Sequence, residues 1–209
     1  MRIGILGTGT VARTLGDALG GAGHDVVLGS RTAGEDKITF AEAVAHGELL
    51  VNATAGAGSV DAIGASARAD REGKVLLDVS NPLDFPSGEL RLTVSNDDSL
   101  GEVIQRAFPE LRVVKSLNTV TASVMVDPGS VPGDHVLFLA GADPTAKAVV
   151  RDLLGELGWR DVQLIDLGGI AGARGMEMYL PLWLTLMQTL GTPVFNVTVE
   201  RGRTPEAGQ

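Results

Sequence analysis

Residues 1–23, MRIGILGTGTVARTLGDALGGAG, indicate the class of fold. A short apolar run at 2–6 is bounded by glycine, a pattern typical of a buried parallel strand. In the segment that comes next, Val11, Leu15 and Leu19 recur every four residues and so share one face of a helix. The chain therefore opens with a strand, a glycine-rich turn and a helix.

The turn itself, GTGTVA, matches the G-x-G-x-x-G/A fingerprint of dinucleotide-binding proteins. Gly7 permits the tight turn, Gly9 lets the backbone approach a pyrophosphate, and Ala12 allows close packing of helix on strand. The N-terminus of the helix offers free N–H groups and a partial positive charge to an anion. Because the turn follows a strand and opens a helix, the context that gives the fingerprint its meaning is present.

The second strand ends in VVLGSRT, residues 26–32. Arg31 lies 24 positions after the first glycine of the fingerprint, where an acidic residue often holds the ribose of NAD. The hydroxyl of Ser30 and the guanidinium of Arg31 suit a 2′-phosphate instead, which indicates NADP. The alternative is a solvated arginine on a turn, and Glu35 and Asp36 are close enough in the sequence to pair with it. The predicted cofactor-binding residues at this strand end are Ser30, Arg31 and Thr32.

Strands and helices alternate along the rest of the chain. We expect strands at 25–30, near 38, and at 48–54, 74–80, 112–118, 135–141 and 161–168. We expect helices at 40–47, 60–69, 99–108, 121–126, 144–158 and 173–191. The alternation predicts an α/β fold of the Rossmann type, doubly wound, with a mostly parallel sheet. It divides into a dinucleotide-binding domain, 1–168, and a small helical C-terminal subdomain with a frayed tail, 169–209.

Composition excludes several classes of protein. Of the 209 residues, 44% are hydrophobic and 21% charged, so the chain can bury a core. The net charge of -9 disfavours general binding to nucleic acid or to an anionic membrane. No cysteine is present, which removes disulfides, iron–sulfur clusters, thiolate catalysis and most structural zinc sites, and we expect no metal site. The apolar stretch 178–187 is too short to span a bilayer and contains Pro181, and the N-terminus has no signal-peptide pattern, so we expect a soluble, cytoplasmic protein.

Ligands of open α/β sheets lie outside the carboxyl ends of the strands. Thr54 and Ala55 are small enough to let a dinucleotide pass closely. Asn81 is placed to hold an amide or a ribose, and Asn118 and Thr119 to donate to a nicotinamide carboxamide or the edge of a flavin-like ring. The alternative for each is an ordinary loop cap. The three loops concerned are 52–59, 80–83 and 116–121.

The sequence assigns no catalytic acid. His24, His46 and His135 lie away from the predicted crevice, which favours structural roles for all three. Asp78 lies inside an apolar strand and is expected to be a buried, hydrogen-bonding acid. Hydride transfer between two rings requires alignment of the reacting carbons more than a proton donor.

With these residues placed, the chain resembles the NADPH-dependent F-420 reductase family. The resemblance rests on residues 1–32, LLDVSNPL at 76–83, VVKSLNTV at 113–120, and 138–159, and it covers nearly all of the chain. The fold is also similar to the cytosolic module of the six-transmembrane ferric reductases. The family has a histidine-containing segment where this chain has Asn118, and a proline–tryptophan loop where this chain has NATAGAGS.

The resemblance implies a Rossmann domain with NADPH across the strand ends and a deazaflavin docked on the nicotinamide. It assigns Ser30 and Arg31 to a 2′-phosphate clamp. It assigns the pyrophosphate loop to Thr8, Gly9, Thr10 and Val11.

We therefore expect an enzyme that transfers hydride between NADPH and F-420 or a flavin-like acceptor. One alternative is an NADPH-dependent reductase of a small imine or carbonyl, and another is a non-catalytic NADP(H)-binding sensor. In the apolar C-terminal helix, Trp183, Leu184 and Met187 would line a second-cofactor pocket, contact a partner copy in a homodimer, or form core. Apolar residues occupy most of its circumference, which favours core together with dimer contact.

Overall fold

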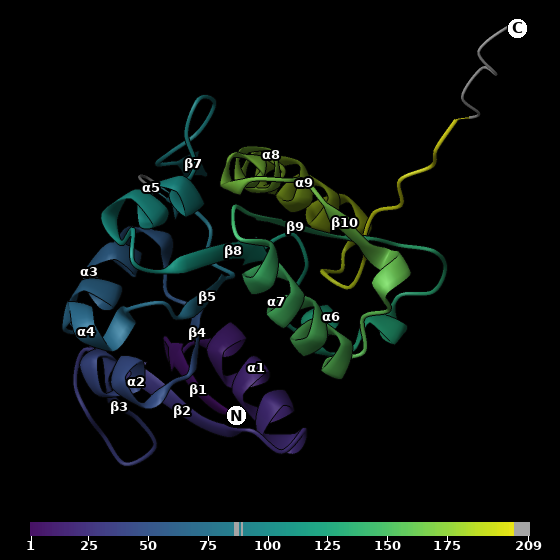
Figure 1. Ribbon diagram of the computed structural model, residues 1–209. Coiled ribbons are helices and arrows are strands. Elements are labelled where there is room, and N and C mark those ends of the chain that lie inside the picture. The colour runs from purple at the N-terminus through teal and green to yellow at the C-terminus, as the bar shows by residue number, and fades with distance from the viewer. Residues whose placement is uncertain (86–87, 89, 203–209) are drawn as a thin grey trace, which may run out of the picture.

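The computed structural model describes residues 1–85, 88 and 90–202, and its centre is an eight-stranded sheet (Figure 1). The strand order is β10-β9-β8-β5-β4-β1-β2-β3. Neighbouring strands are parallel except at the β8–β9 contact, so β9 and β10 run opposite to the rest. The predicted α/β class with a mostly parallel sheet is confirmed.

The strands of this sheet are β1 Arg2–Leu6, β2 Asp25–Ser30, β3 Ile38–Thr39, β4 Leu49–Asn52, β5 Val75–Asp78, β8 Arg112–Ser116, β9 Leu137–Gly141 and β10 Leu164–Asp166. The helices are α1 Thr10–Gly21, α2 Phe40–His46, α3 Ser59–Gly64, α4 Arg68–Arg71, α5 Leu100–Ala107, α6 Ala122–Val126, α7 Pro144–Glu156, α8 Ala173–Met178 and α9 Leu180–Leu190. Short 3₁₀ turns lie at Gly56–Gly58, Pro128–Ser130, Asp161–Gln163 and Ile170–Gly172.

The core lies in two layers, one on each face of the sheet. Ile3 and Ile5 of β1 pack with α1, α6 and α7, whereas Leu6 packs on the other face with α2, α3 and α5. The alternation follows from the two-residue period of a strand, and Figure 1 shows the helices of each layer on opposite sides of the sheet. Burying an Ile or Leu side chain in such a layer contributes about 1.5–3 kcal/mol.

Four predicted elements differ from the structure. The strand expected at 161–168 begins with a 3₁₀ turn, Asp161–Gln163, and only Leu164–Asp166 form β10. The helix expected at 60–69 is divided into α3 and α4, because the guanidinium of Arg71 donates to the carbonyls of Ile63 and Ser66 and ends α3 there. The helix expected at 173–191 is divided into α8 and α9 at Tyr179, since Pro181 has no N–H to donate. After residue 80 the structure forms a hairpin, β6 Leu83–Asp84 with β7 Arg91–Leu92, where the sequence predicts a loop.

Beyond α9 the chain returns to the sheet. The N–H of Val136 donates to the carbonyl of Val197, and Asn196 donates to the carbonyl of Val136. The predicted frayed tail begins at residue 200, and most of it, 203–209, lies outside the described residues. Over the described part of the chain, no helix is both long and apolar enough to cross a membrane. The predicted division at residue 168 stays a prediction.

Candidate functional site

The turn between β1 and α1 has the geometry of an anion site. Gly7 has a φ of 132°, and a Cβ there would lie 2.5 Å from the carbonyl oxygen of Ala53, so only glycine fits. A Cβ on Gly9 would meet nothing within 4 Å, which leaves its backbone open to a ligand. Ala12 is fully buried in the core against the sheet. Each small residue of the fingerprint thus has the environment that the sequence predicts.

The N-terminus of α1 lacks a side-chain cap and has no acidic residue in its first turn. Its first N–H groups therefore have neither an intrahelical acceptor nor a carboxylate beside them. Those groups and the helix dipole attract an anion placed above Thr8 to Val11. Arg13 steadies the turn by donating from Nε to the carbonyl of Thr8 over 3.2 Å.

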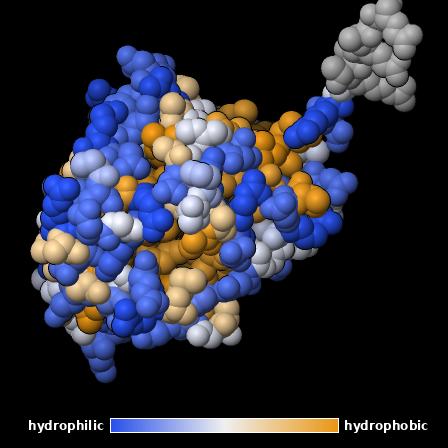
Figure 2. Space-filling model, in the orientation of Figure 1, coloured by the Kyte–Doolittle hydropathy of each residue, from blue (hydrophilic) through white to orange (hydrophobic). Residues whose placement is uncertain are grey.

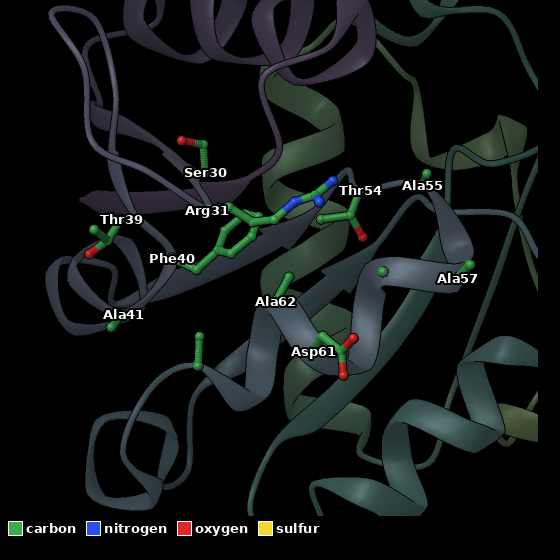
Figure 3. Close-up of a pocket in the computed structure, with 12 residues that line it drawn as sticks. Ser30, Arg31, Thr39, Phe40, Ala41, Thr54, Ala55, Ala57, Asp61 and Ala62 are labelled. Atoms are coloured by element: carbon green, nitrogen blue, oxygen red, sulfur yellow. The ribbon is translucent and has the colours of Figure 1, made fainter.

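An outer cavity of about 750 Å³ lies at the end of β2 (Figure 3). Arg31 and Thr54 lie on its wall, and in Figure 3 the guanidinium of Arg31 extends toward Thr54. Small residues of the α3 region and Phe40 at the start of α2 provide flat apolar walls. The lining residues are Ser30, Arg31, Thr39, Phe40, Ala41, Thr54, Ala55, Ala57, Gly58, Asp61, Ala62 and Ala65.

Arg31 has no ion-pair partner within the described ranges of the chain. Asp36 does not neutralise Arg31, because it pairs with Arg13 at 2.8 Å. Arg31 is exposed, as the alternative of a solvated arginine on a turn also requires. The hydrogen bond from Arg13 holds the pKa of Asp36 below its usual range. The guanidinium that faces the outer cavity is therefore available for an anionic ligand.

The other two residues of this strand end are placed differently. The hydroxyl of Ser30 donates to the carbonyl of Thr32, which shapes the turn, and in Figure 3 it points away from the guanidinium. Thr32 is exposed and is not part of the outer cavity's wall. Of the predicted cluster, only Arg31 presents its charged or polar group to the cavity.

Two further cavities continue from the first along the carboxyl ends of the strands. A middle cavity of about 380 Å³ shares Thr54 and Ala55 with the outer cavity. An inner cavity of about 300 Å³ shares Val11, Val79 and Asn81 with the middle one. The inner cavity is lined by Thr10, Val11, Val79, Asn81, Asn118, Val120, Thr121, Ala122, Met125, Leu180 and Trp183. The three cavities form a row that passes over the N-terminus of α1.

The structure brings most of the predicted loop residues to this row. Thr54, Ala55, Asn81 and Asn118 line it, whereas Thr119 is buried outside it. None of the three histidines lines a cavity of the row. Wall residues such as Phe40, Asp61 and Val79 were not predicted, because nothing in their local pattern distinguishes them from core or helix residues.

A buried polar network lies beneath the row. Asn52 donates from Nδ2 to Asp78 at 2.9 Å, Ser59 at 3.0 Å and Ser80 at 3.1 Å. Thr54 donates to the Oδ1 of Asn52 at 2.7 Å, which fixes the wall between the outer and middle cavities. Asp78 is fully buried and hydrogen-bonded, so that expectation is confirmed.

Lys115 carries a buried charge that was not among the predicted site residues. Its Nζ lies 2.9 Å from the carboxylate of Asp78 and 2.8 Å from that of Glu177, and the Lys115 side chain has no exposed surface. Burial alone would lower the pKa of Lys115, but the two carboxylates raise it above its usual value. Glu177 also accepts from the N–H groups of Leu100 and Gly101, at 2.7 and 3.1 Å. The network thus joins β5, β8, α5 and α8.

The inner cavity is bounded by a strained segment. Leu117, at the end of β8, has a φ of 63°, which is rare for a residue other than glycine. The next residue, Asn118, exchanges hydrogen bonds with Asn81, each over 2.9 Å. Backbone strain of this kind persists where the surrounding structure imposes it and is frequent at functional sites.

Comparisons with known proteins place the chain among reductases. A crystal structure from Arthrobacter sp. FB24, named a putative F-420-dependent NADP-reductase, is 46% identical, with a TM-score of 0.90, and the match covers 96% of this chain and all of that one. Metalloreductase STEAP3 of Rattus norvegicus is 31% identical over 87% of this chain. The F-420-dependent NADP reductase of Methanocaldococcus jannaschii is 31% identical over 55% of this chain. The matches span 38% and 51% of the two curated relatives, and no family model matches.

Replacing the buried lysine tests the network. Lys115→Met removes the cation and leaves the carboxylates of Asp78 and Glu177 buried without it. We expect the free energy of unfolding, measured by urea titration, to fall by about 3–5 kcal/mol. The control is Arg68→Met, which breaks the exposed ion pair with Glu72 and should leave the free energy of unfolding unchanged. A loss no greater than the control's would show that the buried pairs do not hold these elements together.

Proposed function

The chain belongs to the family of F-420-dependent NADP reductases, and we propose that it is an NADP(H)-dependent oxidoreductase that exchanges hydride with coenzyme F-420 or a flavin-like ring. The observation that carries the proposal is the row of three adjoining cavities over the N-terminus of α1. The row begins beside the guanidinium of Arg31, and we propose that one NADP(H) molecule lies along it.

The proposed cofactor lies with its pyrophosphate over the turn at Gly7 and Gly9, where the free N–H groups of α1 neutralise its charge. The adenosine occupies the outer cavity, between the apolar walls of α2 and α3. Arg31 binds the 2′-phosphate through paired, charge-assisted hydrogen bonds. The nicotinamide half crosses the middle cavity beside Asn81 and reaches the inner one.

The inner cavity suits direct transfer between two rings. When bound, the reduced nicotinamide supplies a hydride. Apolar side chains such as Val11, Val79 and Met125 exclude water and hold the ring face, and exclusion of water protects a hydride donor from side reactions. Among the residues that the structure describes, no Asp, Glu, His, Lys or Tyr lines this cavity. The lining therefore aligns reactants and supplies no strong general acid.

Two alternatives use the same row of cavities. Reduction of an imine or a carbonyl is less well supported, because it calls for a proton donor beside the nicotinamide, and the described lining of the inner cavity offers only the hydroxyls of Thr10 and Thr121. A non-catalytic NADP(H) sensor would bind the dinucleotide along the same row, and it differs from the enzyme in having no turnover with any acceptor.

We also propose that the chain self-associates through α9, which is apolar around most of its circumference. Leu182 and Leu190 are each 55% exposed, and Figure 2 shows hydrophobic surface over α8 and α9. Large exposed apolar patches mark interaction sites, and we propose a second copy of this chain as the occupant.

Substitution of Arg31 tests the choice of cofactor. In Arg31→Ala the 2′-phosphate loses its charged partner, and hydrogen bonds to charged groups are worth about 1.5–3 kcal/mol. Titration calorimetry should show NADP⁺ binding roughly 10- to 150-fold weaker and NAD⁺ binding unchanged. The control is Arg106→Ala, which removes an ion pair with Asp98 outside the row of cavities. It should change neither the affinity for NADP⁺ nor the affinity for NAD⁺. An unaltered preference for NADP⁺ in Arg31→Ala would contradict the role given to this residue.

The acceptor is tested by mixing the protein with NADPH and, separately, with F-420, FMN or FAD. We expect the absorbance of NADPH and of oxidised F-420 to fall together, as the hydride of NADPH passes to the F-420 ring and one proton is taken up from the solvent. Turnover of a small imine or ketone in place of all three ring acceptors would support the first alternative. Tight binding of NADPH without turnover of any acceptor would support the sensor.

Sedimentation velocity measures the self-association. We expect a particle of twice the 21.6 kDa mass of the chain, and Leu182→Glu should return it to the monomer. Val162→Glu is the matched control, because Val162 is 82% exposed and belongs to the 3₁₀ turn Asp161–Gln163, not to α9. A wild-type protein that stays monomeric at micromolar concentration would exclude the dimer.

A further inference from the structure

The described part of the chain contains three buried side-chain polar atoms without a hydrogen-bond partner: Oδ1 of Asn118, the hydroxyl of Tyr179 and Nε1 of Trp183. Two of these residues, Asn118 and Trp183, line the inner cavity, and Tyr179 does not. Buried polar groups nearly always have partners, so unpaired ones beside a cavity point to a ligand that supplies them.

The orientation of Asn118 is fixed by its neighbours. Its Nδ2 donates to the Oδ1 of Asn81 over 2.9 Å and to the carbonyl of Met176 over 3.3 Å. Rotating the amide by half a turn would place an oxygen against both acceptors and lose both bonds. The unpaired Oδ1 is therefore a hydrogen-bond acceptor with a defined place.

Trp183 supplies the opposite function. An indole N–H can only donate. The ring is stacked on Phe195, with centroids 5.5 Å apart and planes inclined by 24°, which supports the plane of the indole. Asn118, in the loop after β8, and Trp183, on α9, thus bring one unpaired acceptor and one unpaired donor to the wall of the inner cavity.

We propose that Asn118 and Trp183 together recognise the carboxamide of the nicotinamide, an inference that rests on the proposed binding of NADP(H). A carboxamide has an NH₂ group that donates and a carbonyl that accepts, which complements one acceptor and one donor. The NH₂ donates to Oδ1 of Asn118, and the carbonyl accepts from Nε1–H of Trp183. These two side chains then set the plane of the ring and select an amide over a carboxylate or a ketone at the same position.

Ligands that differ only at this group test the proposal. The probes are NADP⁺, its 3-acetylpyridine analogue, its nicotinic acid analogue, and 2′,5′-ADP, which has no nicotinamide. Both analogues lack the NH₂ donor and leave Oδ1 of Asn118 unpaired, so the wild-type protein should bind each roughly tenfold or more weakly than NADP⁺. Equal affinity for the three dinucleotides would overturn the proposal.

Two matched variants isolate the donor. Trp183→Phe keeps an aromatic ring beside Phe195 and removes the N–H, so NADP⁺ should bind roughly three- to tenfold more weakly while 2′,5′-ADP binds as before. Trp159→Phe is the control, because its N–H donates to the carbonyl of Met125 and it lines none of the three cavities. If the two variants bound NADP⁺ equally well, the role of Trp183 would be excluded. If the wild type bound neither NADP⁺ nor 2′,5′-ADP, the proposed function itself would fail.

Discussion

The buried ion pairs of Lys115 with Asp78 and Glu177 hold the framework of the site in place. The lysine projects from β8, and its two partners come from β5 and α8, so one cation fixes two strands and a helix that is distant in sequence. Isolated charges of this kind are costly to bury, and the pairs persist because each carboxylate has further donors. Glu177 holds the N-terminus of α5 as well. With α8 fixed in this way, α9 is positioned to place Trp183 over the inner cavity.

The charge of the cavity walls changes from the outer to the inner end of the row, and the same framework sets this change. At the outer end, Asp36 is engaged by Arg13, which leaves the guanidinium of Arg31 facing the cavity. In the middle, the uncapped start of α1 adds a partial positive charge. At the inner end the described lining carries no ionisable side chain. Positive charge thus lies where the proposed NADP(H) has its phosphates, and ionisable side chains are absent where the nicotinamide and a second ring would meet.

The features that could be predicted from the sequence are those with local determinants. Gly7 and Ala12 could be predicted because a tight turn and a close helix–strand contact each restrict one residue. The position of Arg31 followed from its distance along the chain. The partners of Lys115 could not be predicted, because Glu177 reaches it only through the packing of α8 on the sheet. The lysine itself was a visible signal, since a charge inside an apolar strand needs a buried partner. The break at Tyr179 was also readable from Pro181.

Whether one NADP(H) molecule occupies all three cavities is decided by a crystal structure of the protein with NADP⁺. We expect the 2′-phosphate against the guanidinium of Arg31, the pyrophosphate over the turn that begins at Gly7, and the nicotinamide in the inner cavity between Asn118 and Trp183. A dinucleotide whose 2′-phosphate lies away from Arg31, or whose nicotinamide lies outside the inner cavity, would contradict the proposed mode of binding.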